Sequence, residues 1–144
     1  MTQAIIQKTI HASCVLIQTS GVLILGPSGS GKSSLSLRLI GLGGKLVADD
    51  QTILTHDRDQ IIATCPAAIQ GRIEARGVGI VNLSSEKWAQ ISVVVDMGST
   101  VKKRMPTNET YNLFGIDLPL IRFAPLDAFA EAVYYSITGN LERG

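Results

Sequence analysis

Apolar runs separated by turn-forming residues set the pattern of the first part of the chain. Apolar and β-branched residues fill positions 5–10 and 12–18, and residues 22–25 are apolar throughout, as in a strand buried on both faces. Between 32 and 42 leucines recur at i, i+4 and i+7, which is helical spacing, and Gly43-Gly44 follows as a stop signal. This pattern predicts strands followed by a helix.

Downstream, the pattern predicts further strands and a second helix. The expected elements are a buried strand at 45–48, a hairpin formed by 51–56 and 61–65, a short helix capped by 84–87, a strand at 91–95 and a helix at 126–138. Residues 98–110 are predicted to form a polar loop, and Pro119 restricts 116–123 to an edge strand or an interrupted strand. Parallel and antiparallel pairing is expected in one mixed sheet, which makes the fold class α/β.

The composition fits one soluble globular domain over residues 1–144. The chain is 45% apolar and 17% charged, with a net charge of +1 and no basic stripe, which argues against a nucleic-acid partner. Its apolar runs are far shorter than the roughly 20 residues of a membrane span, and no secretory signal is recognisable. A cytoplasmic location is expected, and Cys14 and Cys65 are expected to be buried free thiols.

A glycine-rich loop lies between the expected strand at 22–25 and the expected helix. Its residues, Gly26-Pro27-Ser28-Gly29-Ser30-Gly31-Lys32-Ser33, fit the pattern G-x-x-x-x-G-K-[ST]. In this pattern glycines let backbone N–H groups turn toward phosphate oxygens, and the following helix adds its positive N-terminal end. Lys32 is expected to neutralise the β- and γ-phosphates and Ser33 to coordinate Mg²⁺. The loop therefore predicts an ATP-binding phosphotransferase domain.

Acidic residues follow the next expected strand. Asp49 and Asp50 lie where side chains at the carboxyl end of a strand approach a ligand in an α/β sheet. One would serve as general base on an attacking hydroxyl and the other would lie near the metal, although a solvated turn explains the same pair. Glu74 and Arg76 alternate on one face of an expected strand, either as a metal-side carboxylate beside a phosphate-binding guanidinium or as an exposed ion pair.

Two further residues carry weaker signals. His11 stands alone between apolar residues, which is usual for a histidine satisfied in a core or at a strand edge. Arg104, with Lys102 and Lys103, fits either a mobile phosphate-binding loop or a solvated run of charge. These residues alone do not assign a role to either side chain.

Together, the motifs resemble the catalytic domain of HPr kinase/phosphorylase, the bacterial enzyme that phosphorylates a serine of the sugar-transport phosphocarrier HPr. The family has a histidine ahead of the loop, the loop itself, a Leu-Val-Ala-Asp-Asp segment and an Ile-Glu-x-Arg-Gly-x-Gly-Ile signature. Their counterparts here are His11, residues 26–33, residues 46–50 and residues 73–80. As in the family, an arginine, here Arg104, precedes a further matching stretch at 112–119.

This resemblance implies a mixed α/β P-loop fold related to the nucleotide-binding core of phosphoenolpyruvate carboxykinases. It also implies roles for the site residues: Lys32 on phosphate, Ser33 and Glu74 near Mg²⁺, one of Asp49 and Asp50 as acceptor of the seryl proton, and His11 and Arg104 as supporting active-site residues. Arg76, in the same signature as Glu74, is counted among the candidate catalytic residues. Asp50 is slightly preferred as the base. The implied cofactors are ATP and Mg²⁺, the implied substrate and partner is an HPr-like carrier, and the implied assembly is a homo-oligomer, a hexamer.

Departures from the family pattern limit these implications. The chain begins close to His11 and ends soon after the last expected helix, so a short form without the N-terminal domain and with altered oligomer contacts is expected. The family's Val-Arg-Pro-Gly-Arg-Asn element, tied to the reverse phosphorolysis, aligns with residues 124–129, which hold no arginine and leave that reaction in doubt. A non-catalytic ATP-sensing module and a small-molecule P-loop kinase are the alternatives.

Overall fold

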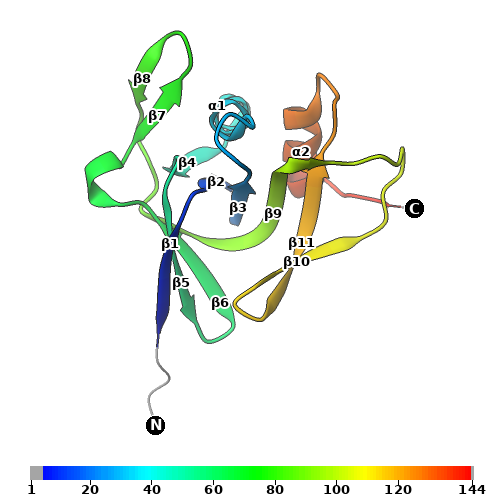
Figure 1. The fold of residues 1–144 in the computed structure, drawn as a ribbon, viewed down its shortest axis with the longest axis horizontal. Coiled ribbons are helices and arrows are strands. Elements are labelled where there is room, and N and C mark those ends of the chain that lie inside the picture. The colour runs from blue at the N-terminus through cyan, green and yellow to red at the C-terminus, as the bar shows by residue number, and fades with distance from the viewer. Residues whose placement is uncertain (1–4, 144) are drawn as a thin grey trace.

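A mixed sheet with two helices on one face makes up the computed structural model in Figure 1. The structure describes residues 5–143, so residues 1–4 and 144 of the expected domain lie outside the described residues. Nine strands form the sheet in the order β1-β5-β6-β9-β3-β2-β4, with β11 also on β9 and β10 beyond it. The mixed α/β fold class predicted from the sequence is therefore confirmed.

The elements have the following bounds. The strands of the main sheet are β1 (Ile6–Ile10), β2 (Ser13–Ile17), β3 (Ser20–Leu25), β4 (Lys45–Ala48), β5 (Thr52–Asp57), β6 (Gln60–Thr64), β9 (Trp88–Thr100), β10 (Glu109–Leu113) and β11 (Ile116–Phe123). A separate two-stranded sheet contains β7 (Arg72–Ala75) and β8 (Gly79–Asn82), and the helices are α1 (Lys32–Leu42), a short 3₁₀ helix at Ala67–Ile69, and α2 (Phe129–Thr138).

The strand directions bring the ends of three strands to one edge of the sheet. β3 pairs parallel with β9, and both β3 and β4 pair antiparallel with β2, so β3, β4 and β9 run in the same direction. The segments that follow these strands therefore start at the same edge, which is where ligands bind in open α/β sheets. The glycine loop follows β3, and Asp49-Asp50 follows β4.

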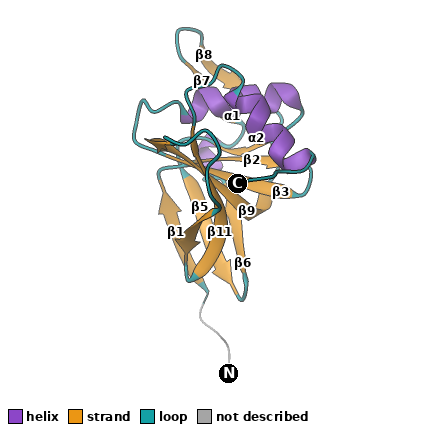
Figure 2. Cartoon of the chain, turned by 90° about the vertical axis from the view of Figure 1, so that its right-hand side faces the viewer, coloured by secondary structure: helices purple, strands orange, loops and turns teal. Residues whose placement is uncertain are grey.

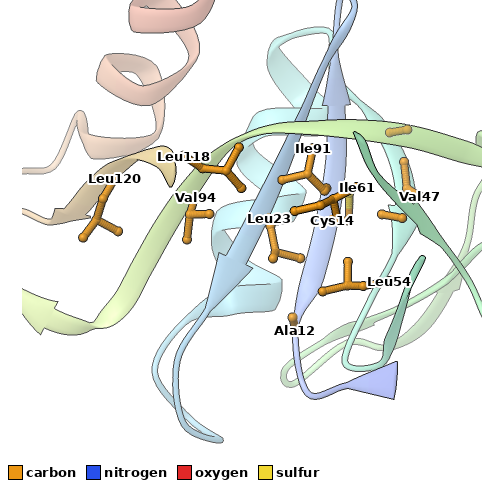
Figure 3. Packing of buried hydrophobic residues seen from close by; sticks show 12 residues of the cluster. Ala12, Cys14, Leu23, Val47, Leu54, Ile61, Ile91, Val94, Leu118 and Leu120 are labelled. Carbon is orange, nitrogen blue, oxygen red and sulfur yellow. The ribbon is translucent and has the colours of Figure 1, made fainter. Parts of the chain in front are cut away.

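The core lies on both faces of the central strands. Figure 2 shows α1 and α2 together on one face of the sheet, where Val22 and Ile24 of β3 pack with Leu35 and Leu39 of α1. Leu23 points to the opposite face, into the second cluster shown in Figure 3. Because successive side chains of a strand alternate between faces, β3 is buried on both, as its apolar run predicted. No helix among the described residues is long and apolar enough to cross a membrane.

The hairpin formed by β7 and β8 stands apart from the main sheet (Figure 1). Ile73 anchors it, with 1% of its surface exposed, whereas Val78 at the turn is 83% exposed. The exposed Glu74 flanks Ile73 on β7, and Arg76 follows directly after the strand. The hairpin is therefore fixed at its base, next to α1, and open to solvent at its tip.

The prediction of a short helix after residues 84–87 is wrong, since strand β9 begins at Trp88. Here the Glu86 N–H donates to the Leu46 carbonyl at 2.8 Å, and Ser85 forms an isolated parallel bridge with Leu46. Pairing with a strand that is distant in sequence therefore outweighs the local capping signal, because capping residues act only where the chain is otherwise free to begin a helix.

The predicted polar loop at 98–110 is shorter than expected. β9 continues to Thr100 and β10 begins at Glu109, which leaves 101–108 as the loop. For 116–123, the prediction of an interrupted strand is wrong, whereas the prediction of an edge strand holds for its first part. β11 is continuous, but its pairing with β9 begins only at Leu120, so beside Pro119 it pairs with β10 alone. Proline is tolerated where one side of the strand is unpaired.

The two cysteines are free, as predicted, but they differ in burial. Cys14 is buried, and burial raises the pKa of its thiol far above the ordinary range. Cys65 is only half-buried, but its burial and the charge of Asp49 also raise the pKa of its thiol. Because only the Cys65 thiol is accessible to solvent in the folded chain, we expect an aromatic disulfide reagent to modify Cys65 slowly in the native protein and Cys14 only after unfolding. Absorbance during labelling of the wild type and of Cys65→Ser measures this, and rapid labelling of native Cys65→Ser would contradict it.

Candidate active site

The glycine loop occupies the turn between β3 and α1. Gly29 and Gly31 have positive φ angles of 81° and 100°, a backbone conformation that residues with a side chain rarely adopt. Gly31 is the N-cap of α1 and supplies no side-chain hydrogen bond, and the first turn contains no acidic residue. The N–H groups of this helix end are thus free of capping side chains, which is the arrangement that binds phosphate.

Lys32 is folded back over the loop. Its side-chain Nζ donates hydrogen bonds to the carbonyls of Gly26, at 2.8 Å, and Pro27, at 3.1 Å. Only 6% of the residue is exposed, so its charge lies in the loop rather than in bulk solvent. A compact ammonium held in this way is a fixed positive charge beside the helix N-terminus.

Asp49 is buried among hydroxyl and amide donors. It is 5% exposed, and its Oδ1 accepts hydrogen bonds from Ser13 Oγ and Ser33 Oγ, both at 2.8 Å. Its Oδ2 accepts from the Glu74 backbone N–H at 3.3 Å. The carboxylate therefore lies beside the loop serine, and the two together present oxygen atoms of the kind that Mg²⁺ prefers.

Asp50 has different surroundings, although it is the next residue. Its side chain is 67% exposed, and its Oδ1 lies 2.6 Å from His11 Nε2. The backbone adopts a positive φ of 70°, which is uncommon for a residue with a side chain, and the Asp50 carbonyl accepts a hydrogen bond from the Ala12 N–H at 3.1 Å. The unusual backbone turns the two carboxylates to different places, one inward to Ser33 and one outward to His11.

A pocket of about 160 Å³ brings most of the predicted residues together. It is lined by His11, Ser28, Gly29, Gly31, Lys32, Ser33, Ser34, Asp50, Glu74 and Arg76. Gly26, Pro27 and Ser30 complete the loop without lining the pocket, and Asp49 lies buried beneath Ser33. The structure thus brings the loop together with His11, Asp50, Glu74 and Arg76, whose roles remain predictions.

Arg104 is the predicted site residue that lies elsewhere. It belongs to the loop between β9 and β10 and lines a second cavity, of about 560 Å³, bounded also by β11 and α2. It does not line the pocket of the glycine loop. Its role in the active site remains a prediction.

Ser13 is a site residue that the sequence analysis missed. It is fully buried, donates to Asp49 and lies 3.4 Å from the Asp50 backbone N–H, which donates to its hydroxyl. The sequence did contain a signal for it, because Ser13 is a polar residue at the start of an otherwise apolar strand. It also lies two positions after His11, and alternate residues of an extended segment share a face.

The pocket contains oxygen atoms of the kind that hold a metal bound to phosphate. The residues from 5 to 143 contain no group of three or more His, Cys, Asp or Glu side chains arranged to hold a metal ion. Mg²⁺ in phosphate sites is usually held by one or two protein oxygens together with phosphates and water, so such a group is not required. Ser33 Oγ and the Asp49 carboxylate, with Glu74 at the rim, are the oxygens that would hold it.

A strand, a glycine loop and a helix in a mixed sheet, with paired acids at the end of the next strand along the chain, are the arrangement typical of P-loop nucleotide-binding α/β domains. Comparison with known proteins narrows the class. Residues 3–119 match the family model described as HPr Serine kinase C-terminal domain. The chain belongs to this family.

Individual relatives agree with the family match. The chain is 31% identical over 131 residues to HPr kinase/phosphorylase of Xylella fastidiosa (strain M12), covering 80% of this chain and 42% of the relative. It is 35% identical over 121 residues to HPr kinase/phosphorylase 1 of Oceanobacillus iheyensis, covering 78% and 37%. The chain thus spans less than half the length of these relatives.

A solved structure supports the same fold. The Hpr(Ser) kinase/phosphatase from Coxiella burnetii superposes with a TM-score of 0.77 and 29% sequence identity, over 91% of this chain and 88% of that one. The similarity in fold therefore extends over nine-tenths of this chain, and the family match over residues 3–119 includes the glycine loop and the acid pair.

Proposed function

We propose that this protein uses Mg·ATP to phosphorylate a serine of an HPr-like phosphocarrier protein. The observation that carries the proposal is the division of the acid pair at the pocket of the glycine loop, which Asp50 lines and beneath which Asp49 is buried. Asp49 is buried against Ser33 of the loop, whereas Asp50 is exposed and held by His11. A kinase needs both an oxygen site for the metal and a free carboxylate for the incoming hydroxyl.

The loop binds and orients the nucleotide. The N–H groups at the start of α1 and the ammonium of Lys32 lie where they neutralise phosphate oxygens, and Ser33 with Asp49 holds the metal side. When bound, Mg·ATP supplies the phosphoryl group, and its metal spreads the negative charge of the β- and γ-phosphates. Arg76 and Glu74 also line the pocket, where the guanidinium adds a positive charge for phosphate and the carboxylate adds a negative charge for the metal.

Asp50 accepts the proton of the seryl hydroxyl in this proposal. Its exposure lets a hydroxyl on another protein reach it, and its contact with His11 fixes the direction of the carboxylate. A base must lie within hydrogen-bond reach of the proton that it removes, and a positioned base contributes by orientation as well as by basicity. The same contact lets the imidazole stabilise charge on the carboxylate.

The reverse phosphorolysis is not part of the proposal. Residues 124–129, where the family element linked to that reaction aligns, hold no arginine, and Ala124, Pro125, Leu126 and Phe129 line the second cavity. The residues proposed for the kinase direction are those of the first pocket together with Asp49 beneath Ser33.

A coupled assay of ADP formation separates this function from its alternatives. We expect ADP to form from Mg·ATP when HPr from the same organism is present, and little ADP when HPr is omitted or its target serine is replaced by alanine. No ADP under either condition, together with measurable ATP binding, would indicate a sensing module instead. ADP formation with small hydroxylated metabolites and without HPr would indicate a small-molecule kinase.

A further inference from the structure

A bulge in β9 presses against the first residues of the glycine loop. Arg122 of β11 pairs with Asp96 of β9, but the next residue pairs with Thr100, so residues 97–99 are left over as the bulge. Asp96 is itself the register partner of Leu25, the last residue of β3 before the loop. The bulge therefore begins directly beside the start of the loop.

The contact between the bulge and the loop leaves no spare room. A Cβ atom placed on Gly98 would lie 3.0 Å from Pro27 Cδ and 3.7 Å from Gly26 Cα. A Cβ on Gly26 would lie 3.1 Å from Met97 Cβ. Since Lys32 donates to the carbonyls of Gly26 and Pro27, the bulge touches the two residues that hold the loop lysine.

A chain of charged and polar side chains fixes the shape of the bulge. Asp96 Oδ1 accepts from the Gly98 N–H and Asp96 Oδ2 from Ser99 Oγ, both at 2.8 Å. The Ser99 hydroxyl in turn accepts from Arg122 at 2.7 Å. Two nitrogens of Arg122, Nε and one terminal amine, reach the Glu109 carboxylate at 2.8–3.1 Å, a geometry that fixes the guanidinium plane.

We infer that Asp96 is a positioning residue for nucleotide binding, and that Ser99 and Arg122 hold it in place. Asp96 does not line the pocket, so it acts through the bulge and the backbone of Gly26 and Pro27 rather than by touching the nucleotide. Without its two acceptor oxygens the bulge loses its shape, and the carbonyls that hold Lys32 lose their support. The inference rests on the proposed nucleotide-binding function of the loop.

Calorimetric titration of Mg·ATP tests the inference on the unmodified chain and on variants. Asp96→Asn keeps the size of the side chain but loses one acceptor oxygen. We expect the affinity for Mg·ATP to fall about tenfold, which is the lower end of the loss found when a residue that orients the binding groups is replaced. Ser99→Ala is expected to weaken binding in the same direction, and Ser99→Thr, which keeps the hydroxyl, to restore it. The matched control is Asp117→Asn, an exposed carboxylate bonded to Asn112 on the β10–β11 hairpin, which should leave affinity unchanged.

The outcomes separate the inference from the proposed function. If the wild type does not bind Mg·ATP, the proposed function fails before the variants are considered. If the wild type binds Mg·ATP and both Asp96→Asn and Ser99→Ala bind it with the same affinity, the inference is overturned. This holds even if the melting temperatures of the two variants fall, because a loss of stability alone shows a purely structural role. Should Asp96→Asn fail to fold, the Ser99→Ala and Ser99→Thr pair decides alone.

Discussion

Replacing Asp50 with asparagine is expected to lower kcat for phosphorylation of HPr by a factor of about 10²–10⁴, the usual contribution of a positioned general base. The amide keeps the size of the side chain but does not take up a proton. Because Asp50 is 67% exposed and is not bonded to the loop serine, the affinity for Mg·ATP should change little. Initial rates with HPr, together with calorimetric titration of the nucleotide, measure both effects.

The neighbouring substitution should behave differently. Asp49→Asn changes a buried carboxylate that accepts from Ser13 and Ser33, so we expect a higher Mg²⁺ requirement and a lower free energy of unfolding. Asp59→Asn, on the exposed turn between β5 and β6, is the control and should match the wild type. Equal losses of kcat in Asp49→Asn and Asp50→Asn, with equal changes in Mg²⁺ dependence, would contradict the division of roles.

Replacing Lys32 with methionine is expected to lower kcat/KM by about 10²–10³, as found when a preorganised donor to developing charge is removed. Methionine retains the unbranched side chain but removes the ammonium that lies between the loop carbonyls. Lys32→Arg should not restore activity, because the forked guanidinium does not fit a site that is 6% exposed and built around a compact charge. Initial rates at varied ATP measure the loss.

Lys45→Met is the matched control for Lys32→Met. Lys45 carries the same charge at the start of β4, but its side chain is 65% exposed and its Nζ lies 3.9 Å from Glu86, a distance at which a surface pair contributes little. We expect its kinetics to equal those of the wild type. A Lys32→Met protein with unchanged kcat/KM would show that the loop does not bind the transferred phosphate.

Local signals in the sequence were enough to predict the glycine loop with its strand and helix. The residues between β3 and α1 determine their own conformation, since the glycines at 29 and 31 adopt positive φ angles and the apolar run before them is buried on both faces. The motif therefore located Lys32 and Ser33 in the pocket without any knowledge of the rest of the sheet.

Pairing between strands that are distant in the sequence determines which proposed role each aspartate has, and local signals left this open. Which aspartate faces the loop depends on β2 and β4, whose register shifts between Cys14 and Val15, and on the positive φ of Asp50. Neither feature has a local signal, so the residues alone left both roles open to either aspartate. The same limit explains the missed Ser13.

The bulge of β9 illustrates this limit further. Asp96 ends an apolar run, as residues 49 and 50 do, but its contacts with Ser99 and its register with Leu25 arise only when β9 pairs with β3 and β11. The expected strand at 91–95 stopped one residue short of it.

Mapping the phosphorylated residue of HPr tests the central claim most directly. HPr from the same organism is incubated with Mg·ATP and the wild-type protein, and peptide mass spectrometry then locates the modification. One phosphoserine that requires Mg²⁺ and is lost with Lys32→Met is the predicted result. Unmodified HPr, or phosphate found only on a histidine, would contradict the claim that this pocket transfers phosphate to a seryl hydroxyl.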